Sequence, residues 1–97
     1  MSHPQLDAVI AQANARFEAT VARLSEFLRI PAISCQPANH ADVRRLAEQV
    51  RATFAELGLD RARVLELPDA LPCVAAEWMH AGPHAPTLLF YGHYDVQ

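Results

Sequence analysis

His93 and Asp95 are the residues of this chain whose types and spacing best suit metal chemistry. They stand two positions apart in the segment LLFYGHYDVQ, Leu88 to Gln97. Side chains alternate along a strand, so residues two apart project from the same face. A histidine that binds a metal commonly donates its other ring N–H to a carboxylate, which fixes its tautomer. The spacing predicts a metal ligand, His93, oriented by Asp95, while a surface ion pair is the simpler alternative.

Gly92 precedes this pair and allows close backbone approach or an unusual turn at a strand end. His80 and His84 have a ligand spacing for a helix, but Gly82 and Pro83 lie between them. These two residues favour a turn in which both imidazoles are solvated.

The remaining reactive or aromatic groups have simpler interpretations. His3 and His40 lie near the chain start and at a helix start, where solvated or capping roles are expected. Cys35 would need a neighbouring histidine to act as a nucleophile, and the sequence indicates none, so a structural or exposed thiol is expected. Cys73 has no CxxC partner either, so both cysteines are expected as free thiols. Trp78 is expected in the core or on a sheet face.

The elements that must position these groups begin with a long helix. Pro4 suits a first helical turn, and Pro31 ends the helix and makes the segment RIPAIS an extended connector. Apolar residues at steps of three and four predict one helix from Pro4 to Leu28. Its buried stripe is expected to contain Leu6, Val9, Ile10, Ala13, Phe17, Val21, Leu24 and Leu28.

A second helix is predicted after the break at residues 37–39. Asn39 or His40 lies near its cap, and Asp42 in its first turn suits the helix dipole. Gly58 is expected to end it in the left-handed conformation. The apolar stripe consists of Val43, Leu46, Ala47, Val50, Phe54 and Leu57.

Three short apolar segments bounded by proline or glycine then predict three strands, at residues 62–67, 73–79 and 87–92. The turn residues 81–86 predict an antiparallel hairpin of the last two strands. Because residues 87–92 are apolar on both faces, they are expected to form a central strand covered by helices on each side. The sequence predicts an α/β protein with an incomplete mixed sheet.

Composition limits the function classes. The chain has 97 residues, 52% of them hydrophobic and 20% charged, with a net charge of −3. This is the composition of one small globular domain, and its charge excludes a field suited to nucleic acid or acidic lipid. The first residues, MSHPQLDAVIAQANARFEAT, carry neither a signal sequence nor a membrane span, so a cytoplasmic protein is expected.

The segment LLFYGHYDVQ resembles the first metal-ligand segment of a zinc-dependent metallopeptidase family. The family includes cytosolic nonspecific dipeptidase, carnosine dipeptidase, aminoacylase and acetylornithine deacetylase. Its pattern is an apolar strand, Gly or Ser, His, a variable residue, Asp and usually Val, and Tyr94 and Gln97 match the dipeptidase branch. FLRIPAIS, residues 27–34, is similar to the family's connector, although Ala32 stands where Ser is frequent. Residues 42–59 are similar to its second helix.

The resemblance implies that His93 is a ligand of one zinc in a two-zinc site and that Asp95 is the catalytic residue that orients it. It implies hydrolysis of the amide bond of dipeptides or small peptides by a zinc-activated water, and a homodimer for the complete enzyme. The other ligands, the Glu general base and the dimerisation domain lie downstream in the family. Residues 1–97 are therefore expected to be the amino-terminal part of a metallopeptidase catalytic domain, truncated after the first metal-ligand motif and inactive alone, since a catalytic zinc needs about three protein ligands.

Two alternatives remain open. One is another hydrolase of the same family, such as an N-acyl amino acid deacylase or a carboxypeptidase. The other is a non-enzymatic α/β module that binds a partner through an exposed strand edge.

Overall fold

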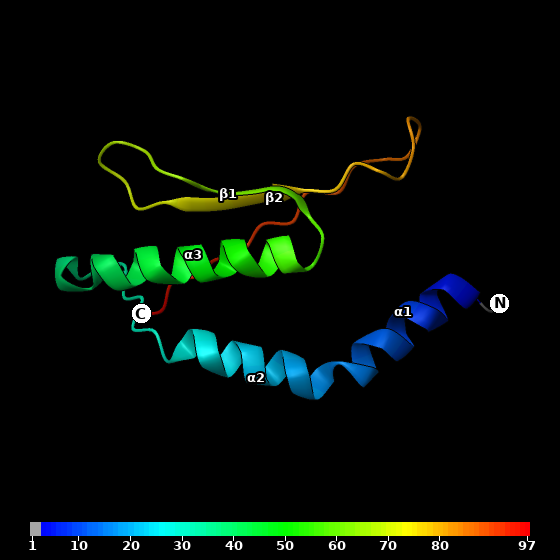
Figure 1. Ribbon diagram of the computed structural model, residues 1–97, viewed down its shortest axis with the longest axis horizontal. Helices are drawn as coiled ribbons and strands as arrows, with labels where there is room; N and C mark the ends of the chain where they lie inside the picture. The colour runs from blue at the N-terminus through cyan, green and yellow to red at the C-terminus, as the bar shows by residue number, and fades with distance from the viewer. Residues whose placement is uncertain (1–2) are drawn as a thin grey trace.

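The structure, a computed structural model, describes residues 3–97 and is a small α/β arrangement (Figure 1). This confirms the α/β class. The elements in chain order are α1 (Pro4–Ala15), α2 (Phe17–Leu28), the short 3₁₀ helix η1 (Pro37–Asn39), α3 (His40–Glu56), β1 (Asp60–Leu65) and β2 (Cys73–Glu77). In Figure 1 the β1–β2 hairpin, α3 and α2 follow one another as three layers, and α1 projects beyond them. Within residues 3–97 no helix is both long and apolar enough to cross a bilayer.

The single helix expected from Pro4 to Leu28 is instead two helices. Arg16 separates them with φ −97° and ψ 1°, outside the helical region. The apolar stripe of these helices was expected to be buried, and this is also wrong. Phe17 is 65% exposed and Val21 is 44% exposed. Figure 1 shows that α1 projects away from the other elements. The periodicity of apolar residues predicted the helices, but it does not determine whether another element packs on their apolar face.

Helix α3 begins and ends where the sequence predicts. Gly58 has φ +85°, and its N–H donates to Ala55 O at 3.0 Å. The N–H of Leu59 donates to Phe54 O at 3.1 Å. These two bonds form a Schellman motif, in which the left-handed residue satisfies the final carbonyl groups of the helix. The expected role of Gly58 is confirmed.

Replacing Gly58 with alanine is expected to destabilise the fold by about 1 kcal/mol, because a Cβ at positive φ is strained. No atom lies within 4 Å of a Cβ built there, so the cost is conformational and not a clash. The urea unfolding midpoint measures it. Gly92→Ala is the matched control, since that position also has open space but no positive φ. Equal midpoint shifts for the two variants would contradict the assignment.

The sheet has two antiparallel strands, not three. Leu65 pairs with Cys73 and Val64 with Val74, and a register shift interrupts β1 between Asp60 and Arg63. One face of this hairpin lies against α3 (Figure 1). The predicted hairpin of residues 73–79 with residues 87–92 is wrong, because among the described residues β2 pairs with β1 alone and residues 87–92 form no strand.

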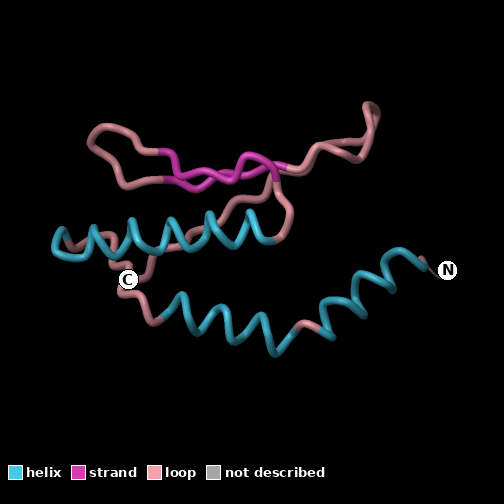
Figure 2. The backbone as a smooth tube through the Cα atoms, viewed as in Figure 1, coloured by secondary structure: helices cyan, strands magenta, loops and turns pink. Residues whose placement is uncertain are grey.

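Residues 87–92 form no strand, which corrects the expected central strand. The chain reverses direction through a turn in which Ala85 N–H donates to Gly82 O at 3.3 Å, and the returning segment runs as loop (Figure 2). Leu89 is 93% exposed and Phe90 is 88% exposed. A strand needs hydrogen-bonded neighbours, and residues 3–97 provide none for this segment. Within the described residues, its apolar side chains at positions 88–91 are therefore exposed.

The buried core is small and lies between α3 and the connector after α2. Its residues are Ile30, Ala32, Val43, Leu46 and Ala47. Around them pack the half-buried residues Phe27, Val50, Leu71 and Tyr94. Of the predicted α3 stripe, Val43, Leu46 and Ala47 are buried and Val50 and Phe54 are partly buried, whereas Leu57 is 61% exposed.

The molecule exposes more surface than a compact protein of its size. Its accessible surface is 7917 Å², whereas a compact protein of 10.7 kDa exposes about 5,500 Å². Its radius of gyration is 16.2 Å, against about 13 Å for a compact domain of 100 residues. The exposed large apolar residues include members of α1 and α2 and residues 88–91.

Candidate functional site

The candidate site contains His93 and Asp95, which face each other. His93 Nδ1 lies 3.5 Å from Asp95 Oδ1, slightly longer than an ordinary hydrogen bond. The imidazole is 74% exposed and the carboxylate 27% exposed, so the ring is accessible while the acid is half-buried. The segment is extended but is not a strand, so the alternation of side chains, and not sheet pairing, places the two groups on one side.

Ser34 holds the second oxygen of this carboxylate. Its hydroxyl donates to Asp95 Oδ2 at 2.6 Å, across 61 positions of sequence. This hydrogen bond is the main cause of a pKa of Asp95 below the ordinary value, and the nearby His93 adds to the effect. The carboxylate is therefore held in its charged form, the form that accepts a hydrogen bond from an imidazole N–H.

The connector after α2 brings Ser34 to the site. Val96 N–H donates to Ala32 O at 2.9 Å, and Ile33 and Val96 form an isolated parallel bridge. Ala32 is fully buried, so this contact joins the site segment to the core. From the other side, the Asn39 side chain donates to Pro31 O at 3.1 Å, which ties the connector to the start of α3.

The second ring nitrogen of His93 faces Tyr91. The Tyr91 hydroxyl lies 3.3 Å from His93 Nε2, and the two rings meet edge to face with centroids 5.5 Å apart. If Asp95 accepts from Nδ1–H, Nε2 carries the lone pair and accepts from Tyr91. Nε2 is then the nitrogen available to a metal. The pair lies at a shallow hollow of about 240 Å³ whose apolar lining includes Val43, Leu71 and Pro72.

The described residues do not complete a metal site. Among residues 3–97 no three His, Cys, Asp or Glu side chains are grouped to hold an ion. His93 and Asp95 fit one ligand and its orienting acid, which is less than the three protein ligands of a catalytic zinc.

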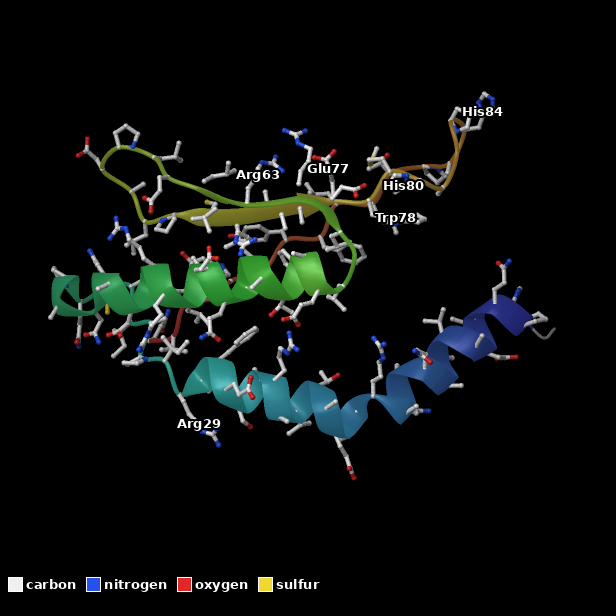
Figure 3. All side chains as sticks on the ribbon, in the orientation of Figure 1. Arg29, Arg63, Glu77, Trp78, His80 and His84 are labelled. Atoms are coloured by element: carbon white, nitrogen blue, oxygen red, sulfur yellow. The ribbon has the colours of Figure 1, made fainter. Side chains whose placement is uncertain are left out.

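His80 and His84 lie away from this pair. His80 contacts Asp60 through its Nε2, and its ring meets Trp78 edge to face. Figure 3 shows His84 at the tip of the loop and His80 near its base, so they do not converge. Both are exposed, as the sequence predicted. His40 differs from its expected solvated or capping role, because its Nε2 lies 3.1 Å from the backbone oxygen of Ser34.

Three further expectations have clear outcomes. Cys35 and Cys73 are exposed free thiols, as expected. Trp78 is 55% exposed and follows the last residue of β2, so it lies neither in the core nor on a strand, and the expected position is wrong. Gly92 has neither a positive φ nor any atom within 4 Å of a built Cβ, so it serves no close approach here.

Tyr94, between the two site residues, anchors the segment. Its hydroxyl donates to Pro72 O, and its ring packs on the core. Burial raises the pKa of this phenol above its ordinary value. Tyr94 thus ties the segment that carries His93 and Asp95 to the core and to Pro72.

This pKa predicts a loss of stability at high pH. The folded state favours the neutral phenol, so its stabilisation is complete below the unfolded pKa of about 10 and is lost as the pH rises from there through the higher folded pKa. In Tyr91→Phe, Tyr94 is the remaining tyrosine of the two in the chain, and tyrosinate absorbance reports it alone. We expect its midpoint to lie higher in the folded chain than in urea. The same titration midpoint in the folded chain and in urea would contradict the burial of the Tyr94 hydroxyl.

Ser34 is the site residue that the sequence did not indicate. The signal available was its position at the end of FLRIPAIS, and no periodicity relates it to Asp95. Contacts between residues 61 positions apart are decided by how the connector packs.

No family model and no solved structure matches this chain.

Proposed function

We propose that this chain contributes the first metal-ligand segment of a zinc-dependent, dipeptidase-like hydrolase. His93 is the ligand and Asp95 orients it. The reaction is hydrolysis of the amide bond of dipeptides or small peptides at a two-zinc site, in a complete enzyme that is a homodimer.

The contact between His93 Nδ1 and Asp95 Oδ1 carries the proposal. It supports the role because the carboxylate faces Nδ1, which leaves Nε2, beside the Tyr91 hydroxyl, as the nitrogen that could bind the metal. A simple surface ion pair would not need a second hydrogen bond to its carboxylate. The Asp95 carboxylate has such a bond, from the Ser34 hydroxyl.

The zinc requires further ligands beyond the described residues. A bound zinc ion supplies Lewis acidity that polarises a carbonyl and acidifies water near neutral pH. Residues 3–97 provide one ligand and its acid, so the proposal assigns the other ligands and the general base to further protein. The large exposed apolar surfaces of α1, α2 and residues 88–91 support such packing.

Zinc-dependent hydrolysis by the full product of the gene tests the proposal. The protein is freed of metal with a chelator, and hydrolysis of dipeptides and of N-acyl amino acids is measured before and after zinc is added. We expect zinc to restore dipeptide hydrolysis. Hydrolysis of N-acyl amino acids instead would favour the deacylase alternative, and no zinc-restored hydrolysis of either class would reject the proposal.

The non-enzymatic module is a second candidate because residues 88–91 are exposed and unpaired. An apolar extended segment with free backbone groups can add to the edge of a partner's sheet. This candidate requires the 97-residue chain to melt cooperatively as a monomer and to show no metal-dependent activity in the full product.

A further inference from the structure

The contact between Ser34 and Asp95 is a short hydrogen bond. Its length of 2.6 Å lies in the range of charge-assisted O–H···O⁻ bonds, which are about twice as strong as neutral ones. It occupies Oδ2, while Oδ1 faces His93. The serine therefore fixes the rotation of the carboxylate in the orientation that presents Oδ1 to the imidazole.

Asp95 needs this support because little else fixes its side chain. Its 3.5 Å contact with His93 is too long to hold the carboxylate by itself. No ladder of strand hydrogen bonds runs through residues 91–95, and the isolated bridge begins at Val96. Ser34 is the second point at which the site segment is tied to the connector.

Ser34 itself stands on a rigid base. It follows Ala32, which is fully buried, and Ile33, which bridges Val96. The carbonyl of Ser34 lies 3.1 Å from His40 Nε2, in the first residue of α3. The hydroxyl is thus donated from a backbone held on two sides, which lets it determine where the carboxylate points.

A nucleophilic role for Ser34 does not fit this geometry. An activated serine gives its proton to a neighbouring base, commonly a histidine. Here the hydroxyl donates to Asp95, and the nearest histidine contact, from His40, is to the backbone carbonyl. His93 lies on the other carboxylate oxygen. The arrangement orients a histidine and does not activate a hydroxyl.

We propose that Ser34 is a positioning residue that fixes the Asp95 carboxylate and thereby holds His93 as the Nδ1–H tautomer, so that the lone pair lies on Nε2, beside the Tyr91 hydroxyl, where a divalent cation would bind. The metal part of this inference rests on the function proposed above, whereas the tautomer is a property of the chain alone. Without the serine, Asp95 turns away, and the ring proton can move to Nε2, where it blocks metal binding.

Nitrogen NMR of the His93 ring tests the tautomer in the 97-residue chain, at pH 9, where an ordinary imidazole is neutral. The variants are Ser34→Ala, Ser34→Thr and Ser34→Val. Thr and Val have nearly the same shape and differ in the hydroxyl, so this pair decides the result even if the Ala variant does not fold. Ser25→Ala, in α2, is the matched control, since its side chain makes none of the hydrogen bonds of the site.

We expect the Nδ1–H form in the unsubstituted chain, in Ser34→Thr and in Ser25→Ala, and a shift toward Nε2–H in Ser34→Val. Adding Ser34→Val to Asp95→Asn should cause no further shift, because the serine acts through that carboxylate. The Nδ1–H form persisting in Ser34→Val, or an Nε2–H form in the unsubstituted chain, would overturn the inference.

Zinc affinity of the full product then links the tautomer to the metal. Loss of a residue that orients a metal ligand typically costs 10- to 100-fold in affinity, and we expect about tenfold for Ser34→Val relative to Ser34→Thr. The two proposals fail in different ways. Unchanged zinc binding with a shifted tautomer rejects the metal role of His93, while an unshifted tautomer rejects the positioning role of Ser34.

Discussion

Replacing His93 with alanine is expected to abolish zinc-dependent peptide hydrolysis by the full gene product, with a loss larger than about a hundredfold. Changes to residues that merely orient a ligand already cost 10- to 100-fold, and this variant removes the ligand itself. Added zinc should not restore the activity. Hydrolysis rates and bound zinc, measured on the same preparation, check both parts of the expectation.

His84→Ala is the matched control, because His84 is exposed at the loop tip and contacts no site residue among those described (Figure 3). It should retain full activity and full zinc content. The ring of His93 is 74% exposed, so its removal should leave the fold intact, and circular dichroism verifies this. Full activity in His93→Ala would reject the proposed ligand.

Leu46→Ala is expected to unfold most of the chain. Leu46 is 2% exposed at the centre of a core of five buried residues. Truncating a buried leucine costs about 2–5 kcal/mol through lost transfer energy and the cavity left behind. The whole stability of a small domain can be as low as about 5 kcal/mol. Urea titration followed by circular dichroism at the helix band should show the transition lost or moved to much lower denaturant.

Leu57→Ala makes the same chemical change at the end of α3, where the side chain is 61% exposed. We expect it to shift the unfolding midpoint little, since almost no transfer energy is lost there. Similar midpoints for Leu46→Ala and Leu57→Ala would mean that the small core does not stabilise the fold. The site would change with the core, because the connector that carries Ser34 packs on it through Ala32.

Leu46→Ala and His93→Ala test different things: the first tests the core, and the second tests the proposed metal ligand. Leu46 supports the framework that places the connector, while His93 acts at an exposed point of that framework. A protein with Leu46→Ala should lose both structure and metal binding. A protein with His93→Ala should lose only metal binding.

The parts of the fold that were predictable from sequence are those decided by near neighbours. Helix α3, its stripe and its end at Gly58 follow from periodicity and from the preference of glycine for positive φ. The meeting of His93 and Asp95 has the same local origin, because residues two apart share a side of any extended segment. The free thiols and the solvated His80 and His84 also followed from their immediate context.

The errors arose where partners distant in sequence decide the outcome. Residues 87–92 have the composition of a strand, but a strand exists through hydrogen bonds to a neighbour, and no segment of residues 3–97 pairs with them. The break at Arg16 and the exposure of the α1 and α2 stripes have a related cause, since a helical face is buried only if another element covers it.

By itself the sequence determined which segments are helical, where α3 ends, and that an imidazole and a carboxylate meet at the end of the chain's last apolar segment. The tertiary structure alone decided that this carboxylate is held by Ser34, across 61 positions. It also decided that the site segment is tied to the core through Ala32 and Val96. The reason is physical: backbone preference and side-chain alternation act over a few residues, whereas hydrogen bonds between remote segments exist only after the connector has packed against α3.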